Sequence, residues 1–146
     1  MKIGSVSENK DFEKRIAVTP EIVKKYISLG FEVCLTQNYG SHLGITDDQY
    51  IEMGAKISKD EIEILNTSEI IIQLSMLSDK NISNIKEGQT LIGVLNPYDN
   101  KDKLNNLVKK KINIFSLELL PRITRAQSMD ILSSQANLAG YKAVVD

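Results

Sequence analysis

The densest group of polar side chains in this sequence lies late in the chain, after the last of several apolar runs. It consists of Arg122, Gln127, Asp130 and Ser133. Asp130 and Ser133 are three residues apart, which places their side chains one turn apart if the segment is helical. Such groups can hold a planar amide by paired hydrogen bonds, while a guanidinium stacks or pairs beside it. Polar capping of a long helix would explain Asp130, but it would not explain the whole group.

A second segment that could do chemistry is the basic pair Lys14-Arg15, which precedes Thr19-Pro20. It falls in the first connection between a strand pattern and a helix pattern. In open α/β sheets that end of the strands is where ligands bind. Arg15 could bind a carboxylate or a phosphate through two parallel hydrogen bonds, or it could form a structural salt bridge. The residues alone leave both interpretations open.

Several kinds of site are absent from the sequence. It has no G-x-G-x-x-G fingerprint, nucleophile elbow or phosphate loop. One cysteine, Cys34, and one histidine, His42, are too few for a structural metal site, so we expect no metal. A net charge of −1 gives no reason to expect a nucleic-acid partner. No apolar stretch approaches the ~20 residues that span a bilayer, so we expect no direct membrane insertion and a cytoplasmic location.

The elements that must position these residues are strands alternating with helices. Apolar runs such as Ile70-Ile71-Ile72 are apolar on both faces, which is typical of parallel strands covered by helices on both sides. We therefore predict an α/β fold of flavodoxin-like type, with a mainly parallel five-stranded sheet and helices on both faces. The five predicted strands are Lys2–Val6, Phe31–Thr36, Glu69–Leu74, Thr90–Leu95 and Ile112–Leu117.

Local signals mark where the helices begin and end. Thr19-Pro20 supplies an N-cap and a proline at the first helical position, and Gly30 follows as the residue that ends the helix. Thr46 to Gln49 resembles a capping box, in which two side chains cap each other's backbone. Weaker helix patterns are predicted over 60–65, 81–85 and 101–110.

The last segment predicts one unbroken helix from Ala126 to Asp146. Gly140 lies in its interior, where glycine costs roughly 1 kcal/mol relative to alanine, so we expect another backbone to approach closely there. The sequence stops without a glycine or proline that would end the helix. We therefore predict an α/β domain over 1–125, and over 126–146 the start of a long helix that leads to a further lobe.

Motifs at both segments resemble the alanine dehydrogenase and pyridine nucleotide transhydrogenase family. The matching stretches are Arg15–Pro20, Leu29–Val33, Gly54-Ala55, Pro121–Asp130 and Ala139–Tyr141. The resemblance extends over essentially the whole chain. Pro121–Asp130 is its most specific stretch and is more similar to transhydrogenases than to other members.

The resemblance implies the first lobe of a two-lobed NAD(H)-binding domain, with a Rossmann lobe after Asp146. It implies that the loop carrying the Arg, Gln and Asp lies against the nicotinamide end of NAD(H). The residues carried over as catalytic are Arg122, Gln127 and Asp130, and those carried over as cofactor contacts are Arg122, Ile123, Thr124, Arg125, Gln127, Asp130 and Ser133.

The implied reaction is direct hydride transfer between NAD(H) here and NADP(H) on a partner domain, coupled to proton translocation. The implied partners are NADP(H)-binding and membrane-spanning transhydrogenase subunits. The resemblance also implies that the protein is a homodimer and is located on the cytoplasmic side of the inner membrane. The protein would act by orienting two nicotinamide rings and excluding water.

Two alternatives remain at this stage. The chain could be the N-terminal lobe of an alanine dehydrogenase-like, NAD-dependent amino-acid dehydrogenase. The resemblance then implies a substrate-binding Lys on the third predicted strand and a catalytic His after the fourth, but the stretches Ile71–Ser75 and Leu95–Tyr98 contain neither. The other alternative is a non-catalytic flavodoxin-like interaction module.

Overall fold

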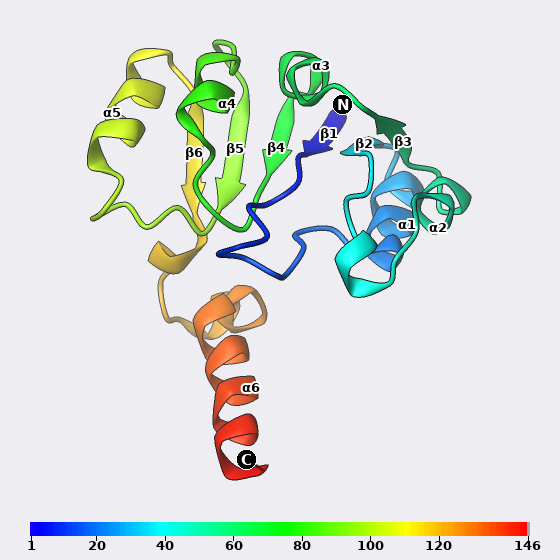
Figure 1. Cartoon of the computed structure of the whole chain (residues 1–146). Coiled ribbons are helices and arrows are strands. Elements are labelled where there is room, and N and C mark those ends of the chain that lie inside the picture. The colour runs from blue at the N-terminus through cyan, green and yellow to red at the C-terminus, as the bar shows by residue number, and fades with distance from the viewer. Residues whose placement is uncertain (146) are drawn as a thin grey trace.

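The computed structural model describes residues 1–145, which form one parallel sheet with helices on both sides and a helix that leaves it (Figure 1). The sheet has six strands in the order β3-β2-β1-β4-β5-β6, and every neighbouring pair is parallel. The strands are β1 Lys2–Ser5, β2 Glu32–Thr36, β3 Lys56–Ser58, β4 Ile70–Ile72, β5 Thr90–Gly93 and β6 Asn113–Ser116. The predicted parallel α/β fold is confirmed.

The predicted number of strands was one too low. Five of the strands match the predicted runs, and the missed one is β3 at the edge of the sheet. Its three residues, Lys56–Ser58, are too few to show an alternating pattern. Without β3 the order is that of a flavodoxin-like sheet, and with β3 it is the doubly wound order of dinucleotide-binding folds.

The helices that connect the strands begin where the sequence places caps. The Thr19 hydroxyl accepts a hydrogen bond from the backbone N–H of Ile22, and Gly30 adopts a φ of 85° after the helix. Thr46 and Gln49 form the predicted capping box. The helices are α1 Pro20–Ser28, α2 Asp47–Glu52, α3 Glu61–Thr67, α4 Asp79–Ser83 and α5 Lys101–Lys109, with a 3-10 turn, η1, at Ser41–Leu43.

Alternate residues of the strands enter two separate cores, one on each face of the sheet. Val33 and Leu35 of β2 pack with α1, α2 and the buried ring of Tyr39. Cys34, between them in sequence, belongs to the other core, with residues of α3, α4 and α5. This division fixes the register of the central strands, because a slip of one residue would exchange the two sets.

The end of the chain differs from the prediction of one continuous helix over 126–146. A 3-10 turn, η2 (Leu117–Leu119), follows β6, a second, η3, spans Thr124–Met129, and the α-helix α6 spans Ile131–Val145. The break falls at Asp130, whose backbone is extended, with φ −75° and ψ 93°. Asp146 lies outside the described residues.

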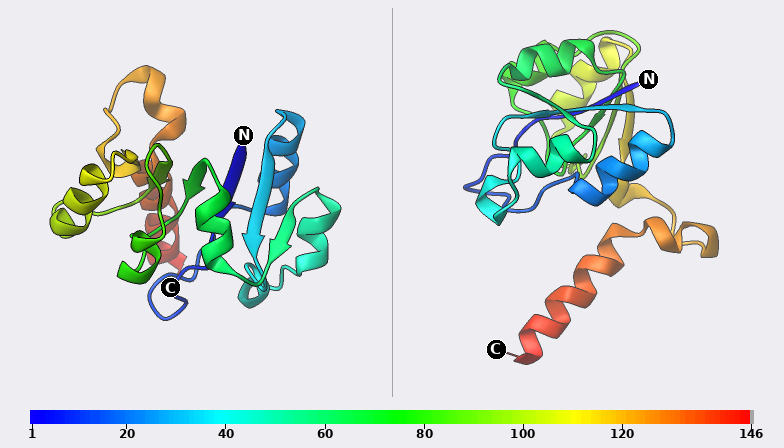
Figure 2. Two further views of the ribbon diagram at one scale, coloured as in Figure 1. Left: turned by 90° about the horizontal axis from the view of Figure 1, so that it is seen from above. Right: turned by 90° about the vertical axis from the view of Figure 1, so that its right-hand side faces the viewer.

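Helix α6 extends away from the carboxyl ends of β4, β5 and β6 (Figures 1 and 2). None of its described residues is buried. Outside the backbone of its own helix, no atom among the described residues lies within 4 Å of a Cβ built on Gly140, so the close approach expected there is not made within residues 1–145. The segment between β6 and α6 therefore lies at the edge of the sheet where α/β proteins bind ligands.

Candidate functional site

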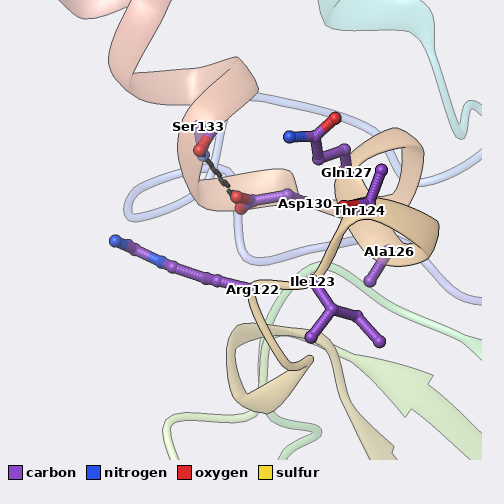
Figure 3. Close-up of a pocket in the computed structure, with 7 residues that line it drawn as sticks. All are labelled: Arg122, Ile123, Thr124, Ala126, Gln127, Asp130 and Ser133. Carbon is purple, nitrogen blue, oxygen red and sulfur yellow. Dashed lines mark hydrogen bonds between the residues drawn. The ribbon is translucent and has the colours of Figure 1, made fainter.

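The polar side chains singled out in the late segment line one cavity beside η3 and the start of α6 (Figure 3). Its volume of about 680 Å³ is in the range of small-molecule sites. The residues that line it are Arg122, Ile123, Thr124, Ala126, Gln127, Asp130 and Ser133. The structure thus brings together six of the seven residues named as cofactor contacts.

Asp130 is held in place by the first turn of α6. Its Oδ1 accepts hydrogen bonds from the backbone N–H groups of Leu132 and Ser133, both at 3.0 Å. Its Oδ2 accepts the hydroxyl of Ser133 at 2.6 Å. The Ser133 hydroxyl, then the backbone donors and the nearby Arg122 charge, hold the pKa of Asp130 below its usual value. The carboxylate is therefore ionised, and its orientation is fixed before any ligand binds.

Arg122 and Gln127 supply the donors and acceptors that remain available. The side chains of Arg122 and Asp130 extend to the same side of the loop in Figure 3. Among residues 1–145, Arg122 and Gln127 make no side-chain hydrogen bond or ion pair. A guanidinium, a neutral amide and an anchored carboxylate thus face one cavity. This set of groups suits a neutral planar amide, whose carbonyl accepts and whose nitrogen donates.

The seventh residue, Arg125, is exposed and is not part of the cavity lining. Ala126 lines the cavity although nothing in the sequence singles it out. It is buried, and its N–H donates to the Ile123 carbonyl at 2.9 Å, which tightens the 3-10 turn. A small apolar residue has no chemical signal in the sequence, so its place in the site depends on this turn.

Arg15 forms the structural salt bridge that was one of its two interpretations. Its Nε donates to Glu13 Oε1 at 2.8 Å and its Nη2 to Glu13 Oε2 at 2.6 Å. Hydrogen bonding to Arg15 lowers the pKa of Glu13, and the same contact raises the pKa of Arg15. The remaining Nη1 donates to Gln135 Oε1 of α6 at 2.8 Å. Sequence reasoning named neither Glu13 nor Gln135 as a partner of Arg15. For Gln135 no rule of spacing exists, because it lies 120 residues from Arg15.

A further polar group lies between β1 and β4, where the winding of the sheet reverses. Glu8 Oε1 accepts the backbone N–H of Leu74 at 2.6 Å, and Glu8 Oε2 accepts the Ser75 hydroxyl. Gln73 reaches the same carboxylate at 3.2 Å through its Nε2. The Glu8 carboxylate is thus engaged with the end of β4.

A larger groove, of about 1110 Å³, lies beside α1, β5, β6 and α5. Its lining is mainly aliphatic and aromatic, including Tyr26, Ile92 and Phe115. It offers few groups that could orient a polar ligand, so we place the candidate site at the polar cavity instead. Within the described residues there is no group of three side chains suited to a metal ion. Nor does any helix in that stretch of the chain have the length and apolarity to cross a membrane.

Comparison with known proteins decides the family. The family described as "Alanine dehydrogenase/PNT, N-terminal domain" matches residues 4–139. The chain belongs to the alanine dehydrogenase/PNT family. An alpha-subunit polypeptide of NAD(P) transhydrogenase from Rhodospirillum rubrum is 42% identical over 151 residues, covering 100% of this chain and 39% of that protein. The chain thus spans well under half the length of this relative.

A solved structure of the family gives the same result. Transhydrogenase from Sinorhizobium meliloti matches with a TM-score of 0.93 and 38% identity, over 100% of this chain and 43% of that one. Alanine dehydrogenase from Methanococcus maripaludis is more distant, at 29% identity over 99% of this chain and 38% of that protein. The resemblance found in the motifs is confirmed, with transhydrogenases more similar to this chain than alanine dehydrogenases are.

Proposed function

We propose that this chain is the first lobe of the NAD(H)-binding alpha subunit of a proton-translocating NAD(P)+ transhydrogenase. The observation that supports this most is the convergence of Arg122, Gln127, Asp130 and Ser133 on one cavity. The similarity to transhydrogenase alpha subunits adds to it. A second, Rossmann-type lobe after residue 146 would hold the rest of the dinucleotide.

In this proposal the cavity receives the nicotinamide end of NAD(H). The anchored Asp130 carboxylate accepts from the carboxamide NH₂, and Arg122 or Gln127 donates to its carbonyl. Bound NADH would supply the hydride, and NADP+ on a partner domain would accept it. The part of Arg122, Gln127 and Asp130 would be to hold the nicotinamide ring in one orientation for this transfer. Catalysis by such positioning needs no nucleophile or proton-transfer residue in this lobe.

We further propose that the subunit is a homodimer on the cytoplasmic side of the inner membrane, attached through membrane-spanning partner subunits. The alternative enzyme, an amino-acid dehydrogenase, is disfavoured by one structural observation. At the end of β4 the Glu8 carboxylate accepts hydrogen bonds from the N–H of Leu74 and the hydroxyl of Ser75, which places a carboxylate at the strand end where the resemblance implies a substrate-binding lysine.

The test is to assay the complete subunit, reconstituted with its NADP(H)-binding partner, for both reactions. Hydride transfer from NADH to an NADP+ analogue, without any effect of alanine, supports the proposal. Alanine-dependent reduction of NAD+ in the absence of the partner would instead assign the chain to an amino-acid dehydrogenase. If the Arg122→Ala, Asp130→Asn double variant keeps full hydride-transfer activity, the cavity is not the nicotinamide site.

A further inference from the structure

Arg15 connects the loop before α1 with helix α6. Its guanidinium contacts Glu13 through Nε and Nη2, and Gln135 on α6 through Nη1. The backbone N–H of Arg15 also donates to Glu13 Oε1, at 2.9 Å. The planar head is therefore fixed by a bidentate pair and one backbone contact, which aims the remaining nitrogen at α6.

The loop that carries Arg15 rests firmly on the body of the fold. On one side of Arg15 the carbonyl of Lys14 is bonded to His42 Nε2 at 2.8 Å. On the other side the N–H of Ala17 donates to the buried hydroxyl of Tyr39 at 3.2 Å, and Val18 is fully buried. These contacts tie both flanks of Arg15 to η1 and to the core under α1. Arg15 is thus a fixed point of the body.

The helix at the other end of the bridge is poorly held by packing. No described residue of α6 is buried, and Leu138 and Tyr141 are exposed. Packing of an apolar face is what normally fixes the angle of a helix on a domain. Gln135 lies five residues after Asp130, so a contact at Gln135 restrains the helix close to the turn that holds the Asp130 carboxylate.

We propose that Arg15, locked by Glu13, is a positioning residue that sets the angle of α6 through Gln135 and thereby places the Asp130–Ser133 pair relative to the body. The inference rests on the function proposed above, because the pair matters for hydride transfer only if it contacts NAD(H). The side-chain partners of Arg15 are Glu13 and Gln135, and neither of them lines the cavity. An exposed contact of this kind contributes little to stability, so its effect is expected on geometry and not on folding.

The direct test is the distance between α1 and α6 in the complete subunit. Spin labels attached to Lys24→Cys and Asn137→Cys report this distance by double electron–electron resonance spectroscopy. Cys34 is buried, which protects it from labelling. Arg15→Ala and Gln135→Ala are each expected to broaden the distance distribution. Ser134→Ala is the matched control, because the Ser134 hydroxyl donates to the Ile131 carbonyl of the same helix. An unchanged distribution in both variants would overturn the inference.

Activity gives the second readout. Arg15→Ala and Gln135→Ala are expected to lower kcat for hydride transfer about tenfold, with unchanged melting temperature. The double variant should be no worse than either single one, since both remove the same bridge. The Gln135→Glu variant keeps an acceptor for Arg15, so its kcat should stay near that of the wild type. If the losses of kcat in the two single variants add up in the double variant, the proposed bridge is wrong. If the distance between α1 and α6 changes while kcat stays normal, the bridge is retained and the proposed function is contradicted.

Discussion

Ser133 donates its hydroxyl to Asp130 Oδ2 at 2.6 Å while its own backbone N–H donates to Asp130 Oδ1 at 3.0 Å. The aspartate thus begins the helix α6 and also presents a fixed negative charge to the cavity. These two roles can be separated by substitution. Asparagine caps a helix about as well as aspartate does, but it carries no charge.

The first prediction concerns this cap. Asp130→Ala should destabilise the start of α6, because the N–H groups of Leu132 and Ser133 lose their acceptor. Asp130→Asn should leave the helix nearly intact. Amide hydrogen exchange at Ser133 measures the difference: faster exchange is expected in the alanine variant only. Equal protection in both variants would show that the carboxylate does not cap α6.

The second prediction uses two glycines as a pair. A Cβ on Gly93 of β5 would clash with the carbonyl oxygen of Gln73, which is backbone and cannot move aside. Gly93→Ala should therefore lower the free energy of unfolding by about 1–3 kcal/mol. Gly140→Ala on α6 should raise it or leave it unchanged, because helix propensity improves by up to about 1 kcal/mol.

Denaturant unfolding of residues 1–146 measures both changes. A stabilised Gly93→Ala variant would contradict the packing of β5 against β4. If Gly140→Ala is neutral in this fragment but harmful in the complete subunit, a neighbouring lobe approaches α6 at Gly140, as the sequence predicts.

The third prediction concerns the buried hydroxyl of Tyr39. It is bonded to Ser5 Oγ at 2.7 Å and accepts the N–H of Ala17. Tyr39→Phe should cost about 1–2 kcal/mol near neutral pH, because buried polar partners lose their bond. Burial also raises the pKa of Tyr39 to about 12.

The sign of the pH effect follows from that pKa. Below pH 10 the phenol is protonated in both the folded and the unfolded chain. Between pH 10 and 12 the unfolded chain loses the proton while the folded one keeps it, so folding stability falls by about 2–3 kcal/mol. Urea unfolding at pH 8 and pH 11.5, in wild type and Tyr39→Phe, isolates this effect, since the phenylalanine variant should lack it. The same pH dependence in both proteins would show that Tyr39 ionises normally.

The sequence was sufficient where a local signal has one physical outcome. Thr19-Pro20 and the Thr46–Gln49 box begin helices in any fold, and the triple isoleucine forms β4 inside the parallel sheet, with Ile71 fully buried. The sequence was insufficient where tertiary contacts decide whether an element forms or where it ends. The strand at Lys56–Ser58 exists because β2 offers it an edge. The helix break at Asp130 depends on which of several polar residues becomes the cap.

The site shows the same division. Arg122, Gln127, Asp130 and Ser133 could be named because such polar residues are unusual together in one segment, and the structure brings them to one cavity. Ala126 could not be named, because its place depends on the 3-10 turn. The partner of Arg15 on α6 could not be named either, because no rule of spacing connects residue 15 to residue 135.

The fourth prediction concerns the fragment itself. Residues 1–146 should bind NADH weakly or undetectably, because the lobe proposed to hold the adenosine and pyrophosphate is not included in it. The complete subunit should bind NADH measurably. Micromolar binding of NADH by the fragment in calorimetry would contradict the two-lobed arrangement.

The central claim is that the cavity beside η3 holds the nicotinamide of NAD(H). Calorimetric titration of the complete subunit with NADH tests it most directly, comparing Arg122→Ala with Arg125→Ala, an arginine three residues away that does not line the cavity. Arg122→Ala should raise Kd at least about tenfold, because a charge-assisted hydrogen bond is lost, and Arg125→Ala should change it little. Equal Kd values in wild type and Arg122→Ala would contradict the claim.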